Sequence, residues 1–433
     1  MGQERITLSK KELKRYKVIE QLIQGFITGG EAAELLGLST RQVYRLKKRV
    51  LEEGETGIIH KNRGRKPAHA LPDETKQNIL ALLSSDRYRN CNDHHFAELL
   101  AKYEGIRVSP STVRRIRCEA KMKPKRKRRP PKAHRPRERK PQAGMLVQMD
   151  ASPHHWLEER SQPFSLHAAI DDATGKIVGA VFRPQEDTAG YFMITRQMIE
   201  NEGIPMGIYS DRHNIFRSPK EEQTIEQELA GEPIALSQFG QALKELGVTH
   251  IKATTPQAKG RIERLFETLQ DRWVVELRLR NVNTLEEANR ILPELIEDYN
   301  QKFAVEPRDP ESAFVPLEPG QLLDLILCYR DERTLGPGET IAYQGKTYKI
   351  HTTDPNQTIP LKTRVEVRQT LDGELFIWYK GKSYPLQETA KPQRQTVPEQ
   401  KKASSEKKSH KPAANHPWRQ YKYPITSRIS QRA

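Results

Sequence analysis

The sequence predicts a protein of several domains: an all-α N-terminal region, an α/β domain with a mixed five-stranded sheet, a small β-barrel and a disordered basic tail. A chain of 433 residues is too long for one hydrophobic core. Apolar residues recur at helical spacing before residue 121, form strands alternating with helices from residue 145, and form short strands after residue 336. Lysine and arginine outnumber aspartate and glutamate by 73 to 56, a net charge of +17. This excess favours a polyanionic partner, with nucleic acid first and an anionic membrane surface second.

The composition also indicates the compartment. The chain has no run of about 18 apolar residues that could span a bilayer, and its first residues lack the apolar core of a signal peptide. The three cysteines, Cys91, Cys118 and Cys328, lie far apart, which argues for a reducing compartment and against a disulfide framework. We therefore expect a soluble, intracellular protein.

Residues 1–58 are predicted to form a helix-turn-helix domain. A helical pattern over 11–27 is followed by a short helix that runs into Gly37 and by a second helix that opens at Ser39. Ser39 and Gln42 have capping-box spacing, and helix, glycine turn and capped helix together make the helix-turn-helix pattern. A generic two-helix hairpin is the alternative. The outward residues expected to read base edges or clamp phosphates are Arg41, Gln42, Arg45 and Lys48.

A basic linker is predicted over residues 59–72, which show no apolar periodicity. Its RGRKP core resembles an AT-hook, a flat segment that can lie in a narrow minor groove through residues such as Arg63 and Arg65. A plain basic linker is an equally good interpretation.

A second helix-turn-helix domain is predicted over residues 73–120. Ser109 can cap its last helix, Pro110 suits the first turn, and the helix then carries Arg114, Arg115 and Arg117. Cys91, Cys118, His94 and His95 could suggest zinc, but the tandem spacings of zinc modules are missing, and we reject that interpretation.

A basic tether is predicted over residues 121–143. Residues 121–140 hold twelve basic residues, one acid and four prolines, so self-repulsion and proline exclude a packed element. We expect this segment to be extended and able to follow a phosphate backbone.

Residues 144–305 are predicted to form the α/β domain, because three strands come first and helices then alternate with strands. The expected strands are 145–150, 164–171, 176–182, 206–211 and 249–253. The expected helices are 188–202, 237–246, one that opens near 257, and 284–301. The segment 212–236 is an insertion without an interpretation.

The C-terminal part is predicted to contain a connector over 306–335 and a small β-barrel over 336–389, where strand-like runs are joined by glycine turns. Residues 390–433 are polar and basic and are expected to be disordered.

Three carboxylates are candidates for one metal site. Asp150 ends the first predicted strand, Asp211 ends the fourth, and Glu263 lies on the helix that opens near 257. If the two strands are parallel neighbours, both aspartates emerge at one sheet edge, where the helix can bring the glutamate. Carboxylates that close together repel unless divalent cations lie between them, and such oxygen ligands suit Mg²⁺ or Mn²⁺. Two such ions can clamp the attacking and leaving oxygens of a phosphoryl displacement.

Other acids and histidines are weaker candidates. Asp171 and Asp172 begin a hairpin turn, where aspartate is favoured for turn geometry alone, and Glu267 lies one turn beyond Glu263. We do not expect these three to bind metal. His154, His155 and His213 lie near the aspartates in sequence. For these histidines, support of neighbouring groups or contact with solvent is a better interpretation than metal binding.

The motifs QMDASPHHW, SDRHNIF, TPQAKGRIERLFETLQDR and the closing YNQKF resemble the DDE transposases with a retroviral-integrase-type catalytic core, particularly bacterial insertion-sequence transposases of the ISNCY type. The resemblance covers most of residues 15–390. It implies a ribonuclease H-like fold, with Asp150, Asp211 and Glu263 matching the family's two aspartates and glutamate. Many members carry a lysine or arginine seven residues after the glutamate, where this chain has Gln270. Arg272, or the turn residues Lys259 and Arg261, would then make that DNA contact.

The resemblance implies a DNA transposase that binds transposon ends, cleaves them with two Mg²⁺ or Mn²⁺ ions and joins the 3′-hydroxyls to target DNA. Its partners would be double-stranded DNA and further copies of itself assembled on DNA, with no membrane and no small-molecule substrate. It would act in the bacterial cytoplasm, associated with the nucleoid. The alternatives are a non-catalytic DNA-binding regulator with a degenerate core, and a ribonuclease H-like nuclease without strand transfer.

Overall fold

The computed structural model describes residues 7–63, 70–125, 137–218, 235–252, 259–351, 359–390 and 413–417. The chain forms two compact units. Unit 1 consists of Met1–Arg135 and Leu269–Val282, and unit 2 of Pro136–Thr268 and Asn283–Ala433. Arg65, residues 126–136 of the predicted tether, most of the 212–236 insertion and most of the predicted tail lie outside the described residues.

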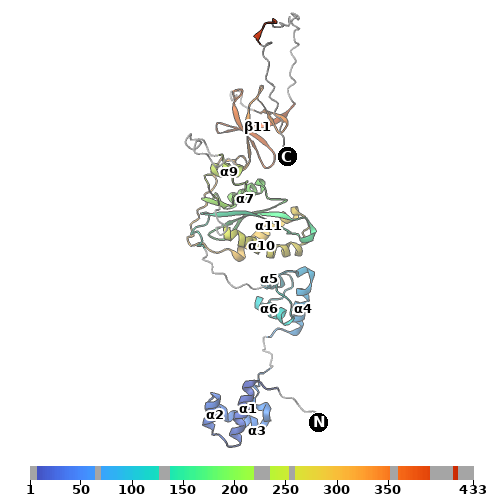
Figure 1. Ribbon diagram of the computed structural model, residues 1–433, viewed down its shortest axis with the longest axis vertical. Helices are drawn as coiled ribbons and strands as arrows, with labels where there is room; N and C mark the ends of the chain where they lie inside the picture. Colours follow the sequence, from blue (N-terminus) through green and yellow to red (C-terminus); the bar gives the residue numbers. More distant parts are fainter. Residues whose placement is uncertain are drawn as a thin grey trace. The chain divides into compact units, whose positions relative to one another are not determined.

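Unit 1 begins with the predicted helix-turn-helix, formed by α1 (Lys10–Ile23), α2 (Gly29–Leu36) and α3 (Thr40–Glu53) (Figure 1). Gly37 ends α2 with a left-handed φ of 60°, which glycine adopts without strain. The Ser39 side chain then accepts a hydrogen bond from the Gln42 amide and caps α3. Val43 and Val50 of α3 are buried against α1, so the other face of α3 is left outward.

The second helical group of unit 1 contains α4 (Asp73–Ser84), α5 (Asp93–Tyr103) and α6 (Pro110–Glu119). Ser109 caps α6 and Pro110 occupies its first turn, as predicted. The second half of α10 (Gly260–Leu279) completes this group, because Val275 is buried in the same cluster as the α5 and α6 side chains. The Arg278 guanidinium also donates to three backbone carbonyls between residues 86 and 89. The sequence placed all of this helix in the catalytic domain.

Unit 2 contains a mixed sheet with strand order β3-β2-β1-β4-β5, which confirms the predicted five-stranded α/β fold of ribonuclease H-like type. Its strands are β1 (Val147–His154), β2 (Phe164–Asp171), β3 (Ile177–Arg183), β4 (Gly207–Ser210) and β5 (Thr249–Lys252). The first three strands are antiparallel, and β4 and β5 run parallel to β1.

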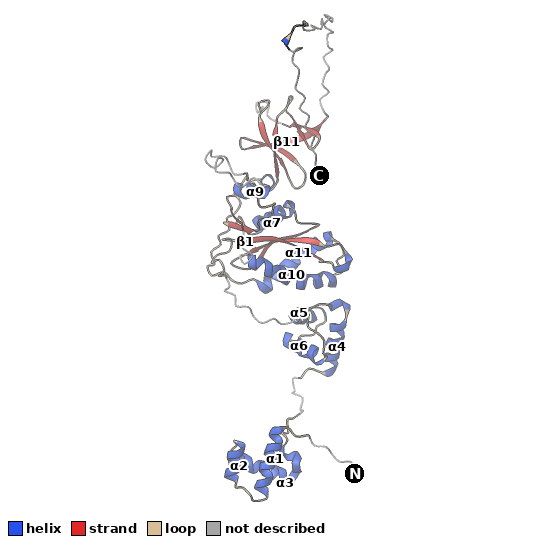
Figure 2. Cartoon of the chain, viewed as in Figure 1, coloured by secondary structure: helices blue, strands red, loops and turns tan. Residues whose placement is uncertain are grey.

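Helices cover both faces of this sheet (Figures 1 and 2). On one face α7 (Thr188–Asn201) and α9 (Gln238–Glu245) bury a core with Val147 and Met149 of β1. On the other face lie α11 (Leu285–Phe303) and the start of α10. The free edge of β3 is capped by side-chain amides, since Asn289 bonds both backbone groups of Phe182 and Asn300 bonds both of Ile177. This capping protects an edge strand from pairing with another chain.

The second sheet of unit 2 is a nearly closed antiparallel barrel with strand order β6-β9-β10-β11-β8-β7, as predicted. Its strands are β6 (Tyr329–Thr334), β7 (Thr340–Tyr343), β8 (Lys346–Ile350), β9 (Arg364–Gln369), β10 (Leu375–Tyr379) and β11 (Lys382–Thr389), with the short helix α12 (Leu323–Ile326) before them. β6 lies in the segment predicted as a connector. In the described part of the chain, no helix has the length and apolar character needed to cross a membrane.

Candidate functional site

Asp150 and Asp211 lie level with each other on adjacent parallel strands. Asp150 is inside β1 and not at its end, because β1 stays paired with β2 as far as His154. Asp211 directly follows β4. The register of β1 and β4 pairs Gln148 with Tyr209, and the same register continued for two residues brings Asp150 opposite Asp211. Neighbouring strands are about 4.8 Å apart, so the two carboxylates are neighbours.

Both aspartates face the side of the sheet on which α10 begins. Side chains alternate between the faces of a strand, so Asp150 shares a face with Gln148, while Met149 points into the core under α7. The Gln148 side-chain oxygen accepts a hydrogen bond from the Ile262 amide in the first turn of α10, at 3.3 Å. Strand alternation and this hydrogen bond therefore both place Asp150 on the face of the sheet where α10 begins.

Lys259, the residue just before α10, links the two aspartates. Its ammonium lies 3.0 Å from Asp150 Oδ2 and 3.5 Å from Asp211 Oδ2, and Lys259 itself is buried. Asp211 also accepts a hydrogen bond from the backbone amide of His213 at 2.9 Å, so His213 supports this carboxylate through its backbone. The sequence predicted Lys259 as a DNA contact, whereas the structure places its ammonium inside the carboxylate pair.

The electrostatics of this pair favour a cation. Burial raises the pKa of Asp150; the Lys259 ammonium opposes this rise, and the charge of Asp211 adds to it. Burial also raises the pKa of Tyr191 well above its ordinary value, and Glu186, Asp150 and Asp211 add to that shift. Among the described residues, the Lys259 ammonium is the cation that both carboxylates share, and one ammonium cannot neutralise two carboxylates. Carboxylate oxygens are the ligands preferred by Mg²⁺ and Mn²⁺, and the ammonium stands in for such a cation, so the residues fit a divalent metal ion.

Glu263 lies in the first turn of α10 and is exposed. Within the described ranges, no three histidine, cysteine, aspartate or glutamate side chains lie together as a metal site requires. The structure thus brings Asp150 and Asp211 together and leaves Glu263 apart from them, about one helical turn beyond Lys259.

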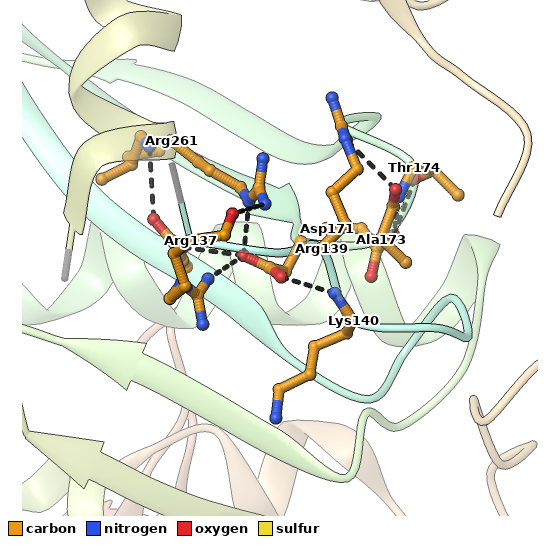
Figure 3. Close-up of polar contacts among 10 residues, drawn as sticks. Arg137, Arg139, Lys140, Asp171, Ala173, Thr174 and Arg261 are labelled. Carbon is orange, nitrogen blue, oxygen red and sulfur yellow. Dashed lines mark hydrogen bonds and ion pairs between the residues drawn. The ribbon is translucent and has the colours of Figure 1, made fainter. Parts of the chain in front are cut away.

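The side chains of Asp171 and Asp172 have different hydrogen-bond partners. Asp171 caps its turn, since it accepts hydrogen bonds from the backbone amides of Gly144 and Thr174 and from the Thr174 hydroxyl. Asp172 instead receives hydrogen bonds from Arg137 and Arg261, residues far from it in sequence. Figure 3 shows these two arginines converging beside the turn. Asp171 thus caps its own turn and holds the amide of Gly144, whereas the bonds of Asp172 to two distant arginines have no explanation in turn geometry.

The predicted DNA-reading side chains of α3 lie on its exposed face. Arg41, Gln42, Arg45 and Lys48 are all exposed, and Lys48 also lies 3.7 Å from the Glu52 carboxylate. Tyr44, which the sequence did not single out, is exposed on the same helix and lies against Gly29 at the start of α2. This face combines guanidinium, amide and aromatic groups of the kinds that contact DNA.

The other predicted DNA contacts divide into exposed and internal residues. Arg114 and Arg115 are exposed on α6, whereas Arg117 is buried and pairs with Asp93 at 2.6 Å. The Arg63 guanidinium lies 2.9 Å from Glu12.

Arg272, a predicted replacement for the family's basic residue, is buried and pairs with Glu98. Arg261 pairs with Asp172 at 2.7 Å. As they lie here, both side chains are engaged within the protein.

Comparisons with known proteins agree with this organisation. A homeodomain-like domain model matches residues 42–116 and a helix-turn-helix domain model matches residues 14–67. The transposase for insertion sequence IS1202 of Streptococcus pneumoniae is 34% identical over 448 residues, covering 94% of this chain and 93% of that protein. The y4bF protein of Sinorhizobium fredii, which carries a provisional transposase assignment, is 35% identical over 393 residues, covering 90% of this chain and 84% of that protein.

Solved structures give weaker likenesses. The HTLV-2 integrase catalytic core domain in complex with magnesium is 15% identical with a TM-score of 0.27, covering 39% of this chain and 94% of that chain. A chain of the simian T-cell lymphotropic virus intasome is 13% identical with a TM-score of 0.27, covering 72% of this chain and 99% of that chain. The fold assignment rests on the strand order described above.

Proposed function

The chain belongs to the transposases of bacterial insertion sequences, and on this premise we propose that it cuts and rejoins DNA at the ends of such an element. It binds the terminal repeats, cleaves phosphodiesters at the element ends and joins the freed 3′-hydroxyls to target DNA. Both DNA partners are double-stranded, and the reaction takes place in the bacterial cytoplasm, on the nucleoid. Because two ends are joined in concert, the active form is a homo-oligomer assembled on DNA.

Asp150 and Asp211 would hold two divalent cations, Mg²⁺ or Mn²⁺, and Glu263 would complete one of the two sites. When bound, such ions activate the attacking oxygen and stabilise the leaving oxygen of an in-line displacement. Lys259 neutralises part of the aspartate charge in the free protein. When DNA is bound, its side-chain ammonium moves from the aspartates to a DNA phosphate. No covalent link between enzyme and DNA is needed, so no serine or tyrosine nucleophile is assigned.

The helix-turn-helix units select the DNA. The exposed residues of α3 (Arg41, Gln42, Arg45 and Lys48) contact base edges and phosphates of the terminal repeat, and Arg114 and Arg115 of α6 add contacts from the second group. Arg63 and Arg65 reach DNA from the linker. Phosphate contacts fix the register of the protein on the duplex, and base-edge contacts supply the sequence information.

One observation carries the proposal: Asp150 and Asp211 share the ammonium of Lys259, at 3.0 and 3.5 Å, on one face of two adjacent parallel strands. A pair of carboxylates around a buried cation, in a chain with helix-turn-helix domains, suits metal-dependent chemistry on DNA.

The test uses the full chain, Mg²⁺ and a DNA fragment ending in the inverted repeat that brackets the gene. We expect specific binding, release of a 3′-hydroxyl at the repeat boundary, and products in which that end is joined to a second DNA. Binding without cleavage would indicate a regulator with a degenerate core. Cleavage without joined products would indicate a nuclease.

A further inference from the structure

Asp172 is a buried carboxylate with partners from three separate segments. It is fully buried at the turn after β2 and receives hydrogen bonds from the guanidinium of Arg137, from the Lys140 backbone amide at 2.9 Å, from the Gln148 side chain at 3.0 Å and from Arg261 Nε at 2.7 Å. A buried charge is tolerated only when it is paired and hydrogen-bonded, and all four partners meet that need.

These contacts connect the two elements that carry the proposed metal ligands. Gln148 lies two residues before Asp150 on the same face of β1, and it donates to Asp172 while accepting from the Ile262 amide at 3.3 Å. Arg261 binds Asp172 directly. These two partners of Asp172 thus lie close to the proposed ligands: Gln148 is near Asp150 on β1, and Arg261 is near Glu263 on α10.

We infer that Asp172 is a positioning residue that fixes the first turn of α10 against β1, and so sets where Glu263 stands relative to Asp150 and Asp211. This inference rests on the proposed function. Groups that orient metal ligands from behind commonly change metal affinity 10- to 100-fold when they are removed.

The same carboxylate also anchors the end of the basic segment. Arg137 and Lys140 belong to the predicted tether, and Arg261 donates to the Arg137 backbone carbonyl at 3.1 Å as well as to Asp172. In Figure 3, Arg137 and Lys140 of one segment and Arg261 of another lie beside the turn that follows Asp171. Without the negative charge, the two guanidinium groups would lie together uncompensated, and the first turn of α10 would lose its attachment.

The neighbouring Asp171 offers a matched control. It is equally buried beside the same turn, but among the described residues its side-chain hydrogen bonds come from Gly144 and Thr174 and not from a side chain of β1 or α10. Asp171→Asn should therefore test the cost of disturbing the turn without disturbing the link to Glu263.

The experiment measures Mn²⁺ binding to the full chain by calorimetry, without DNA, for the wild type and for Asp172→Asn, Arg261→Gln, Asp171→Asn and Asp150→Asn. We expect Asp172→Asn and Arg261→Gln each to weaken Mn²⁺ binding by about tenfold. A chain that carries both substitutions should bind no more weakly than either single variant, and Asp171→Asn should bind like the wild type. Asp150→Asn should lose the site.

Folded Asp172→Asn that binds Mn²⁺ like the wild type would overturn the inference, as would an equal loss in Asp171→Asn. If Asp172→Asn does not fold, Arg261→Gln decides, with weakened binding in support and unchanged binding against. Wild-type Mn²⁺ affinity in Asp150→Asn would overturn the proposed function itself, and the inference with it.

Discussion

At the scale of single residues, Lys259 gives the candidate site its character. A buried ammonium between two carboxylates stabilises them when no other cation is present, and it occupies the position that a metal ion would need. The same contact therefore stabilises the free protein and, in the proposed function, would compete with a bound metal ion. Removing the ammonium should affect these two properties in opposite directions.

Replacing Lys259 with Gln should lower the stability of the metal-free chain by about 1–3 kcal/mol, less than the cost of breaking a fully buried pair because Asp211 is partly exposed. Added Mn²⁺ should then raise the melting temperature of the variant more than that of the wild type. Lys346→Gln is the control, since its pair with Glu388 at 2.8 Å is exposed. A Lys259→Gln chain as stable as the wild type without metal would argue against the role given to this ammonium.

We expect His167 to make unit 2 sensitive to acid. It is fully buried in β2. Its ring Nε2 accepts a hydrogen bond from the backbone amide of Asp187, with 3.2 Å between the two nitrogens. Burial lowers its pKa from 6.5 to about 4. The pKa of His167 is therefore lower in the folded chain than in the unfolded chain, so the folded chain favours the neutral ring. The contribution of the neutral ring to the free energy of unfolding is fully present above pH 6.5. It is lost as the pH falls toward 4, by up to about 3 kcal/mol.

Replacing His167 with Gln should flatten the fall in melting temperature between pH 7 and about pH 4.5. His155→Gln, at an exposed position in the same unit, should follow the wild-type curve. Identical pH dependence in His167→Gln and the wild type would mean that other groups control the acid response.

At the scale of secondary-structure elements, α10 is the element whose role differs most from expectation. Its first turns belong to unit 2 and carry Glu263, whereas residues 269–282 belong to unit 1. In unit 1 this half of the helix supplies Val275 to the α5 and α6 core and Glu276 to a hydrogen bond with buried His95, at 3.2 Å. The second helical group of unit 1 therefore depends on a distant segment, since His95 and Glu276 are 181 residues apart along the chain.

Truncating Val275 to Ala should loosen this group, since removing buried methyl groups costs about 1–3 kcal/mol. Hydrogen exchange on the full chain should show faster exchange in α5 (Asp93–Tyr103), with α1 (Lys10–Ile23) as the internal control. If α5 kept wild-type protection, the second half of α10 would not be part of the core that holds it.

The exposed face of α3 should carry sequence recognition. Alanine at Arg41 or Arg45 should weaken binding to the terminal repeat and reduce its preference over random DNA, by about 1–3 kcal/mol for each base that the side chain no longer reads. Lys14→Ala, on the exposed surface of α1, is the charge-matched control. An equal weakening for repeat and random DNA would assign these arginines to phosphate binding only.

The sequence predicts some elements well and others poorly, for physical reasons. The strands of the first sheet are apolar runs bounded by turns, and the register of β1 and β4 brings the predicted Asp150 and Asp211 together. β6 escapes prediction because its side chains, Tyr329–Thr334, are mostly charged and only half-buried. The role of Asp172 escapes because Arg137 and Arg261 lie 35 and 89 residues away, and nothing local marks such partners.

At the scale of the whole molecule, the chain combines DNA-binding units, a carboxylate site and a net charge of +17. In the proposed function, the charge attracts DNA of any sequence, the exposed helix faces choose among sequences, and the carboxylates perform the chemistry. These tasks lie on different residues. A change in the carboxylates should therefore remove cleavage and leave binding intact.

The assignment of these three carboxylates is tested most directly by the Mg²⁺-dependent cleavage of terminal-repeat DNA. The variants are full-length Asp150→Asn, Asp211→Asn and Glu263→Gln, and binding to the same DNA is measured in parallel. We predict that each variant binds the repeat like the wild type and cleaves it no faster than background, because each removes a proposed metal ligand. Substantial Mg²⁺-dependent cleavage by any one of the three would contradict the account.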